Sequence, residues 1–268
     1  MKNETASLST YLEELQTEGQ YWLLRQEAIE FLQFSENAFR KAAHRLIVKG
    51  KLKRIRGDFY TIVPLEYHAT GSLPASWFID ALIGYLKQKY YVGLLTAASL
   101  QGSAHQQPMA FQVITDKPTR AITVGQVRIE FFYKKTIQPH FYQAMKTASG
   151  TMHVSTAEMT AFDLVRYMNA SGQVNHVSTV LSELAVSLNP DLLAELLKQD
   201  DVEITAAQRL GYLLDFLQST IDLEPLHRCL KQNKVIRRPL VAGSEQPVIQ
   251  YDVRWSILVN ETIEPDEL

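Results

Sequence analysis

Apolar residues recur at helical spacing three times within the first fifty positions of the chain, and short extended segments separate these stretches. The spacing predicts three helices and one brief strand-like segment between the first two of them. The expected helices cover 10–17, 25–32 and 36–49, and the extended segment covers 21–24. Gly19 and Gly50 follow the first and third helices, at the position where glycine commonly ends a helix.

The third of these helices has two chemically different faces. Ser35 precedes it and is a favourable N-cap residue. Its apolar stripe predicts packing against a core and consists of Phe39, Ala42, Ala43, Leu46 and Ile47. Its polar face carries Asn37, Arg40, Lys41, His44 and Arg45.

Two short β-prone runs follow this helix, at 52–56 and 59–63, with Gly57-Asp58 between them. This pattern predicts a hairpin with Gly57 at the first central position of a type II′ turn. Helix, short strand, helix, turn, helix and hairpin is the element order of a winged helix-turn-helix. In that architecture the third helix enters the major groove of DNA, and the hairpin lies along phosphates or in the minor groove.

The charge of this region supports the same interpretation. Eight Lys or Arg and no Asp or Glu lie between Arg40 and Arg56, while the whole chain has 27 basic and 29 acidic residues. A local cationic surface on an acidic protein is typical of phosphate neutralisation, although a solvated surface that keeps the domain soluble is the alternative. The expected DNA-binding residues are Asn37, Arg40, Lys41, His44, Arg45, Lys49, Lys51, Lys53, Arg54 and Arg56.

These residues differ in what they could contact. Asn37 and Arg40 have side chains that pair with adenine and guanine edges, so they are candidates for reading sequence. His44 could contact a phosphate or a base.

The remaining two hundred residues predict a second domain. The stretch 70–74 has the composition of a linker, which suggests a DNA-binding domain at 1–70 and a larger mixed α/β domain at 75–268. Strand-like segments fill its first half, helical segments follow from Thr156, and two strand-like segments end it. The expected class is therefore α+β.

The cysteine content and the lengths of the apolar runs narrow the range of possible functions. The chain has a single cysteine, no apolar run long enough to cross a bilayer and no apolar signal segment after Met1. We therefore expect a cytoplasmic protein without membrane association, disulfide or cysteine-based zinc site. No phosphate-binding or dinucleotide-binding glycine pattern occurs, and no cofactor is expected.

Several motifs in the second part resemble one protein family. Tyr90-Tyr91-Val92-Gly93-Leu94-Leu95-Thr96-Ala97-Ala98 is followed by His105-Gln106-Gln107-Pro108 and by Phe111-Gln112-Val113-Ile114-Thr115. Together with Trp255-Ser256-Ile257-Leu258-Val259-Asn260 near the end, these segments are similar to the AbiEi family, the antitoxins of type IV toxin–antitoxin systems. The resemblance extends over nearly the whole chain.

The resemblance implies a repressor that binds inverted repeats in its own promoter as double-stranded DNA. It also implies an antitoxin that counteracts a nucleotidyltransferase toxin of the AbiEii type without forming a stable complex with it. In that family the C-terminal domain is needed to counteract the toxin.

Two other functions are open on the residues alone. An enzyme with a targeting winged helix would need a catalytic cluster, but His105 has no nearby acidic residue in sequence. Asp116-Lys117 and Glu130 to Lys134 miss the Asp and Glu-x-Lys spacing with which restriction-type nucleases hold a metal. We therefore expect no catalysis. A regulator whose second domain senses a small molecule is the other alternative, since such a pocket has no fixed sequence signature.

Overall fold

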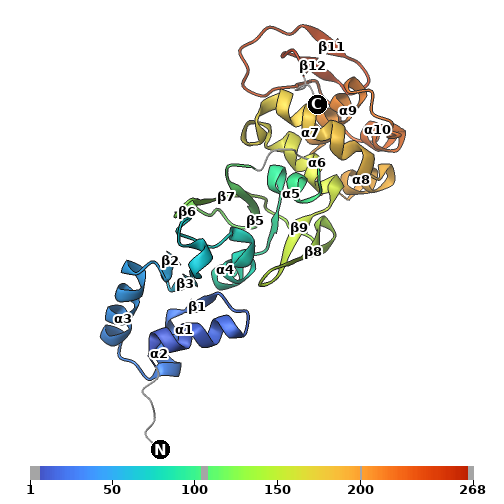
Figure 1. The fold of residues 1–268 in the computed structure, drawn as a ribbon. Coiled ribbons are helices and arrows are strands. Elements are labelled where there is room, and N and C mark those ends of the chain that lie inside the picture. Colours follow the sequence, from blue (N-terminus) through green and yellow to red (C-terminus); the bar gives the residue numbers. More distant parts are fainter. Residues whose placement is uncertain (1–6, 104–107, 200, 265–268) are drawn as a thin grey trace, which may run out of the picture. The chain divides into compact units, whose positions relative to one another are not determined.

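The computed structural model describes residues 7–103, 108–199 and 201–264. This part of the chain forms ten α-helices and three β-sheets of three, three and six strands (Figure 1). The mixed α+β class expected from the sequence is confirmed. The assignment of the N-terminal elements as a winged helix-turn-helix stays a prediction.

The chain separates into two compact units. The first comprises Met1–Tyr91, Met109–Ile137 and Ala144–His153, and the second comprises Val92–Pro108, Gln138–Gln143 and Val154–Leu268. The first unit therefore contains the N-terminal helices and also most of the large sheet.

The N-terminal elements alternate helices with strands of a small antiparallel sheet. In chain order they are α1 (Leu8–Thr17), β1 (Trp22–Leu24), α2 (Arg25–Leu32), α3 (Glu36–Val48), β2 (Leu52–Arg56) and β3 (Phe59–Ile62). The strand order is β1-β3-β2. Helix α3 begins where expected because the Ser35 hydroxyl accepts a hydrogen bond from the Ala38 N–H at 3.2 Å.

These elements share a hydrophobic core of their own. Phe39, Ala43 and Leu46 of α3 are buried in it, together with Leu23 of β1 and Leu52 of β2. The stripe expected on the third helix is thus the side that packs, which leaves the opposite side of α3 facing solvent.

The segment expected to be a linker is packed instead. Ser72 and Leu73 are buried, and the Thr70 carbonyl accepts a hydrogen bond from the Gln126 N–H at 2.9 Å. The linker-like composition of 70–74 therefore did not reveal this packing, because turn-forming residues are also favourable in a buried connection. The domain boundary near residue 70 stays a prediction.

The six-stranded sheet has the order β6-β7-β5-β4-β9-β8. Its strands are β4 (Tyr90–Val92), β5 (Phe111–Thr115), β6 (Ile122–Val124), β7 (Val127–Tyr133), β8 (Tyr142–Thr147) and β9 (Gly150–Ser155). Strands β5 and β7 pair in parallel, and β6 and β7 form an antiparallel hairpin. Helix α4 (Ile79–Leu86) precedes β4, and α5 (Leu94–Leu100) follows it.

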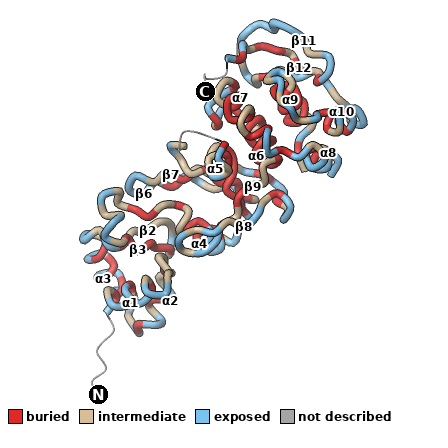
Figure 2. The backbone as a smooth tube through the Cα atoms, turned by 45° about the vertical axis from the view of Figure 1, so that its right-hand side comes forward, coloured by how far each residue is buried: buried red, intermediate tan, exposed pale blue. Residues whose placement is uncertain are grey.

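The second unit is mainly helical. Its helices after α5 are α6 (Ala157–Arg166), α7 (Gln173–Leu184), α8 (Pro190–Lys198), α9 (Ile204–Phe216) and α10 (Glu224–Lys231). A three-stranded sheet completes it, with β12 (Ile257–Val259) between β10 (Arg238–Pro239) and β11 (Gln250–Asp252). Figure 2 shows α6 as almost wholly buried, which fits a central helix of this unit.

Gly211 in α9 allows the Trp255 side chain to pack directly against this helix. A Cβ atom at this position would collide with the buried indole ring of Trp255. None of the helices in the described ranges combines the length and apolar character that crossing a membrane requires.

Candidate nucleic-acid interface

The ten residues expected to bind DNA lie in α3, in the hairpin β2–β3 and in the connection between them (Figure 1). Lys53 and Arg56 are half-buried, and the other eight are exposed. The exposed ones are Asn37, Arg40, Lys41, His44, Arg45, Lys49, Lys51 and Arg54. The sequence pattern therefore identified side chains that solvent, or a partner, can reach.

The eight cations of this set form no ion pair with any carboxylate of the described residues. Their few polar contacts are to backbone oxygens. Arg45 Nε donates to the Lys41 carbonyl at 3.3 Å, and Arg54 Nε donates to the Gly57 carbonyl at 2.6 Å. Neutral carbonyl oxygens leave the positive charges uncompensated, so this surface can accept polyanions.

Two carboxylates that border the cations are held by one arginine. Arg25, at the start of α2, pairs with Glu36 in the first turn of α3 and with Asp58 in the hairpin turn, where Nη1 and Oδ1 are 3.5 Å apart. The Arg25 N–H also donates to the Asp58 carbonyl at 2.9 Å. Arg25 thus joins α2, α3 and the hairpin and offsets the negative charge beside the basic surface.

The hairpin turn packs against α4 within the same unit. The Asp58 N–H donates to the Tyr85 hydroxyl at 3.1 Å, and the Arg56 Nη2 donates to the Arg120 carbonyl at 2.8 Å. Gly57 has φ +55°, the left-handed conformation expected for the turn. A Cβ on Gly57 would collide with the Tyr85 hydroxyl, so Tyr85 lies against one side of the turn, while Gly57 itself is exposed.

Three of the cations also line a cavity of about 250 Å³ between α1 and α3. Arg45, Lys49 and Lys51 form one side of it, and Ser7 and Ser9 at the start of α1 form another. The amide groups at a helix N-terminus favour anions, which adds to the positive potential of the cations here.

The carboxylates considered for a nuclease are engaged elsewhere. Asp116 Oδ1 accepts from the Lys89 N–H at 3.0 Å, and Glu130 pairs with Arg128 at 2.6 Å. Within the described ranges no three His, Cys, Asp or Glu side chains are grouped closely enough to hold a metal ion. His105 lies outside the described residues.

Arg25 and Tyr85 were missed by the sequence interpretation. Arg25 precedes the basic run and lies at the start of a helix, where a cation is not favoured by the helix dipole. The unfavourable position of this cation was the sequence signal that Arg25 has an acidic partner elsewhere in the fold. Tyr85 occupies an apolar stripe position of α4 and carries no signal of its contact with the hairpin.

Together these features define an α+β protein with an exposed, uncompensated basic surface near its N-terminus. Residues 91–216 match the model of the AbiEi antitoxin C-terminal domain. This match confirms the resemblance to the AbiEi family that the sequence motifs predicted, and the matched domain indicates an antitoxin role in a toxin–antitoxin system. This family is not a known family of enzymes.

The fold is similar to that of the RV2827C protein from Mycobacterium tuberculosis, known from a crystal structure. The two share 12% sequence identity at a TM-score of 0.65, and the similarity covers 93% of this chain and 89% of that chain. At this identity the likeness concerns the fold alone. A comparison with curated proteins gave no match.

Proposed function

We propose that this protein is a DNA-binding repressor of its own promoter and the antitoxin of a type IV toxin–antitoxin system. Its toxin would be a nucleotidyltransferase, counteracted without a stable complex. The observation that carries the DNA-binding part is the set of eight exposed or half-exposed cations that lack carboxylate partners among the described residues. Binding of such charges to DNA phosphates would release the cations that are condensed on the DNA.

In this proposal α1–α3 and β1–β3 act as a winged helix-turn-helix. The exposed face of α3 enters the major groove, with Asn37 and Arg40 near its N-terminal end positioned to reach base edges. Arg45, Lys49 and Lys51 contact phosphates, supported by the amides at the start of α1.

The hairpin β2–β3 is the wing in this proposal, and its contacts come from its strands. Tyr85 contacts one side of the Gly57-Asp58 turn, in which Gly57 is exposed, and limits how the hairpin can move when it meets the minor groove. Lys53 and Arg54 remain accessible on β2 and can follow the phosphate backbone. The wing would therefore position the protein on DNA without reading sequence.

The antitoxin part rests on the matched domain, which begins at residue 91 and so lies beyond the basic surface. This suggests that repression and protection depend on different side chains. A variant in which Arg40, Lys41 and Arg45 are all replaced by Ala should lose promoter repression and still protect cells that express the cognate toxin.

The test expresses the antitoxin from an unrelated promoter, so that lost autoregulation does not change its dosage. The matched control replaces Lys198, Lys231 and Lys234 by Ala, because these exposed lysines of the second unit give the same change in net charge and are not among the ten proposed contact residues. Repression lost only in the first variant, with protection retained in it, supports the proposal. If the Arg40, Lys41 and Arg45 variant is folded and abundant but no longer protects, neutralisation of the toxin requires DNA binding. If the same variant still represses the promoter, the proposed DNA interface is wrong.

A further inference from the structure

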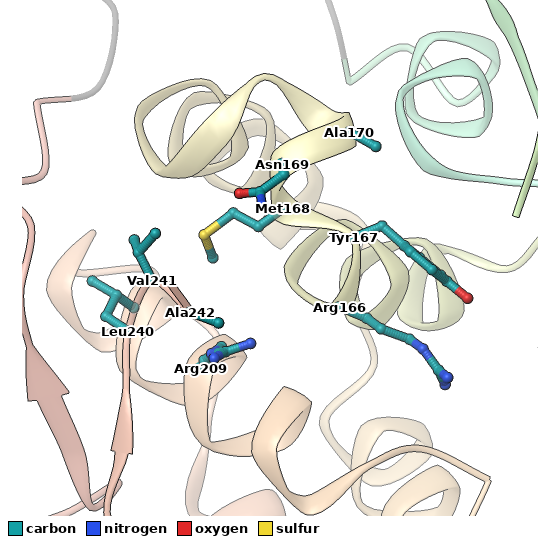
Figure 3. A pocket seen from close by; sticks show the side chains of 9 residues that line it. All are labelled: Arg166, Tyr167, Met168, Asn169, Ala170, Arg209, Leu240, Val241 and Ala242. Atoms are coloured by element: carbon teal, nitrogen blue, oxygen red, sulfur yellow. The ribbon is translucent and has the colours of Figure 1, made fainter. Parts of the chain in front are cut away.

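The second unit contains a cavity of about 230 Å³ between two chain segments and helix α9. Met168 and Asn169 lie on one side of it, Leu240 and Val241 lie on another, and Arg209 of α9 lies below both (Figure 3). Pockets for drug-sized ligands occupy about 300–1,000 Å³, so this one suits a smaller molecule.

Arg209 is the charged group that faces this space. Its Nε and Nη2 both donate to the Pro239 carbonyl, at 3.2 and 3.1 Å, and no carboxylate of the described residues is within ion-pair distance of it. A guanidinium has five N–H groups, so its other donors remain for a ligand. Burial lowers the pKa of Arg209, while the group stays protonated at neutral pH.

Against the effect of burial, Glu203 raises the pKa of Arg209 from beyond ion-pair distance, but this carboxylate is already paired with another cation. Arg166 pairs with Glu203 at 3.0 Å, and Figure 3 shows the Arg166 and Tyr167 side chains directed away from the Leu240–Val241 side. Burial raises the pKa of Tyr167 to about 12, so its hydroxyl adds no negative charge. The net positive charge around the cavity therefore favours the binding of an anion.

The wall opposite Met168 is held in place before any ligand binds. The Asn260 side chain accepts from the Val241 N–H at 3.0 Å and donates to the Val241 carbonyl at 2.9 Å. Arg209 holds Pro239, two residues before Val241, through its carbonyl oxygen. A preformed pocket loses less conformational entropy when it binds a ligand.

We propose that this cavity binds a small organic monoanion, whose carboxylate pairs with Arg209 and whose compact apolar body contacts Met168, Leu240 and Val241. This site goes beyond the DNA-binding and antitoxin functions, and it gives the alternative of a ligand-sensing regulator a defined location. A carboxylate matches the fork of a guanidinium, and the apolar walls match a ring or short chain.

The test titrates benzoate into the full-length protein labelled with ¹³C at the methionine methyl groups. The Met168 signal, identified with a Met168→Leu variant, should shift and saturate, while the signals of Met152 and Met159 should stay in place. Benzyl alcohol has a similar shape without the charge and should bind at least about tenfold more weakly, as should benzoate to Arg209→Gln. The matched control is Arg238→Gln, which removes an exposed neighbouring charge and should change the affinity less than twofold.

The comparison of benzoate with benzyl alcohol uses the wild-type protein, so it remains decisive if Arg209→Gln does not fold. Equal binding of the two molecules, or equal binding of benzoate to folded Arg209→Gln, would overturn the role of Arg209. No saturable shift of Met168 with benzoate would overturn the site. Inorganic phosphate that displaces benzoate completely at equal concentration would overturn the contribution of the apolar walls.

Discussion

The backbone N–H of Asp58 donates a hydrogen bond to the hydroxyl of Tyr85 at 3.1 Å. This contact joins the turn of the β2–β3 hairpin to α4, 27 residues further along the chain. The hairpin is already attached to the N-terminal elements through the pairing of β3 with β1. Its turn has a second attachment through Tyr85, so the direction of the hairpin depends on a residue outside these elements.

Replacing Tyr85 by Phe should remove this hydrogen bond at a cost of about 0.5–1.5 kcal/mol in the free energy of unfolding. Gly57→Ala should cost more, because it adds a collision with the Tyr85 hydroxyl to the strain of a left-handed alanine, which is about 1–2 kcal/mol. Urea denaturation of both variants and of the double variant measures the coupling. We expect Gly57→Ala to cost less when it is combined with Tyr85→Phe, and strictly additive losses would exclude direct contact.

Arg25→Met should weaken DNA binding although Arg25 is not itself one of the ten proposed contact residues. Without it Glu36 and Asp58 have no cation to offset their charge beside the basic surface. Adding Glu36→Gln to the Arg25→Met variant should restore part of the affinity, as measured by fluorescence anisotropy. If the second substitution restores nothing, Arg25 acts by contacting DNA or by holding the fold.

The two helical glycines Gly84 and Gly211 provide a matched pair for stability. Gly211→Ala forces a methyl group against Trp255 and should lower the free energy of unfolding by about 1–3 kcal/mol. Gly84 has open space around its Cβ position, so Gly84→Ala should stabilise α4 by up to about 1 kcal/mol. Thermal unfolding followed by circular dichroism distinguishes these opposite signs. A stabilising Gly211→Ala would contradict the tight packing of Trp255.

Arg40 and Lys53 should differ in their effect on sequence discrimination. Arg40→Ala should reduce the preference for operator over random DNA by roughly 1–3 kcal/mol if its guanidinium makes a bidentate base contact. Lys53→Ala should weaken both complexes by similar factors, because phosphate contacts carry no sequence information. Competition binding with both DNAs measures the difference. An equal loss on both DNAs for Arg40→Ala would assign Arg40 to the phosphate contacts.

The sequence predicted helices well where an apolar stripe and a cap coincided. The helix expected at 36–49 is Glu36–Val48, and Ser35 caps it. Its stripe packs on a core, so local pattern and tertiary packing agree. Strand β8 was not predicted, because its residues are half or fully exposed and several of them are polar. An edge strand with few β-branched residues has no alternation to detect.

The sequence predicted which side chains make up the candidate interface, but it did not predict the residues that pack around them. Eight cations with no acidic residue between the first and the last of them form a local signal, and these side chains are exposed or half-buried in the fold. The contacts of Arg25 with Asp58 and of Tyr85 with the hairpin join residues far apart in sequence, so no local pattern encodes them. The cavity at Arg209 depends likewise on the return of Pro239 to α9.

The salt dependence of promoter binding tests the central claim most directly. The logarithm of the binding constant should fall linearly with the logarithm of salt concentration, with a slope of about −0.9 for each phosphate contacted. Replacing Arg40, Lys41 and Arg45 by Ala should weaken binding and make the slope shallower by up to about 2.7, if all three contact phosphates. An affinity of the wild-type protein that does not change with salt, or a slope that the three substitutions leave unchanged, would contradict the account.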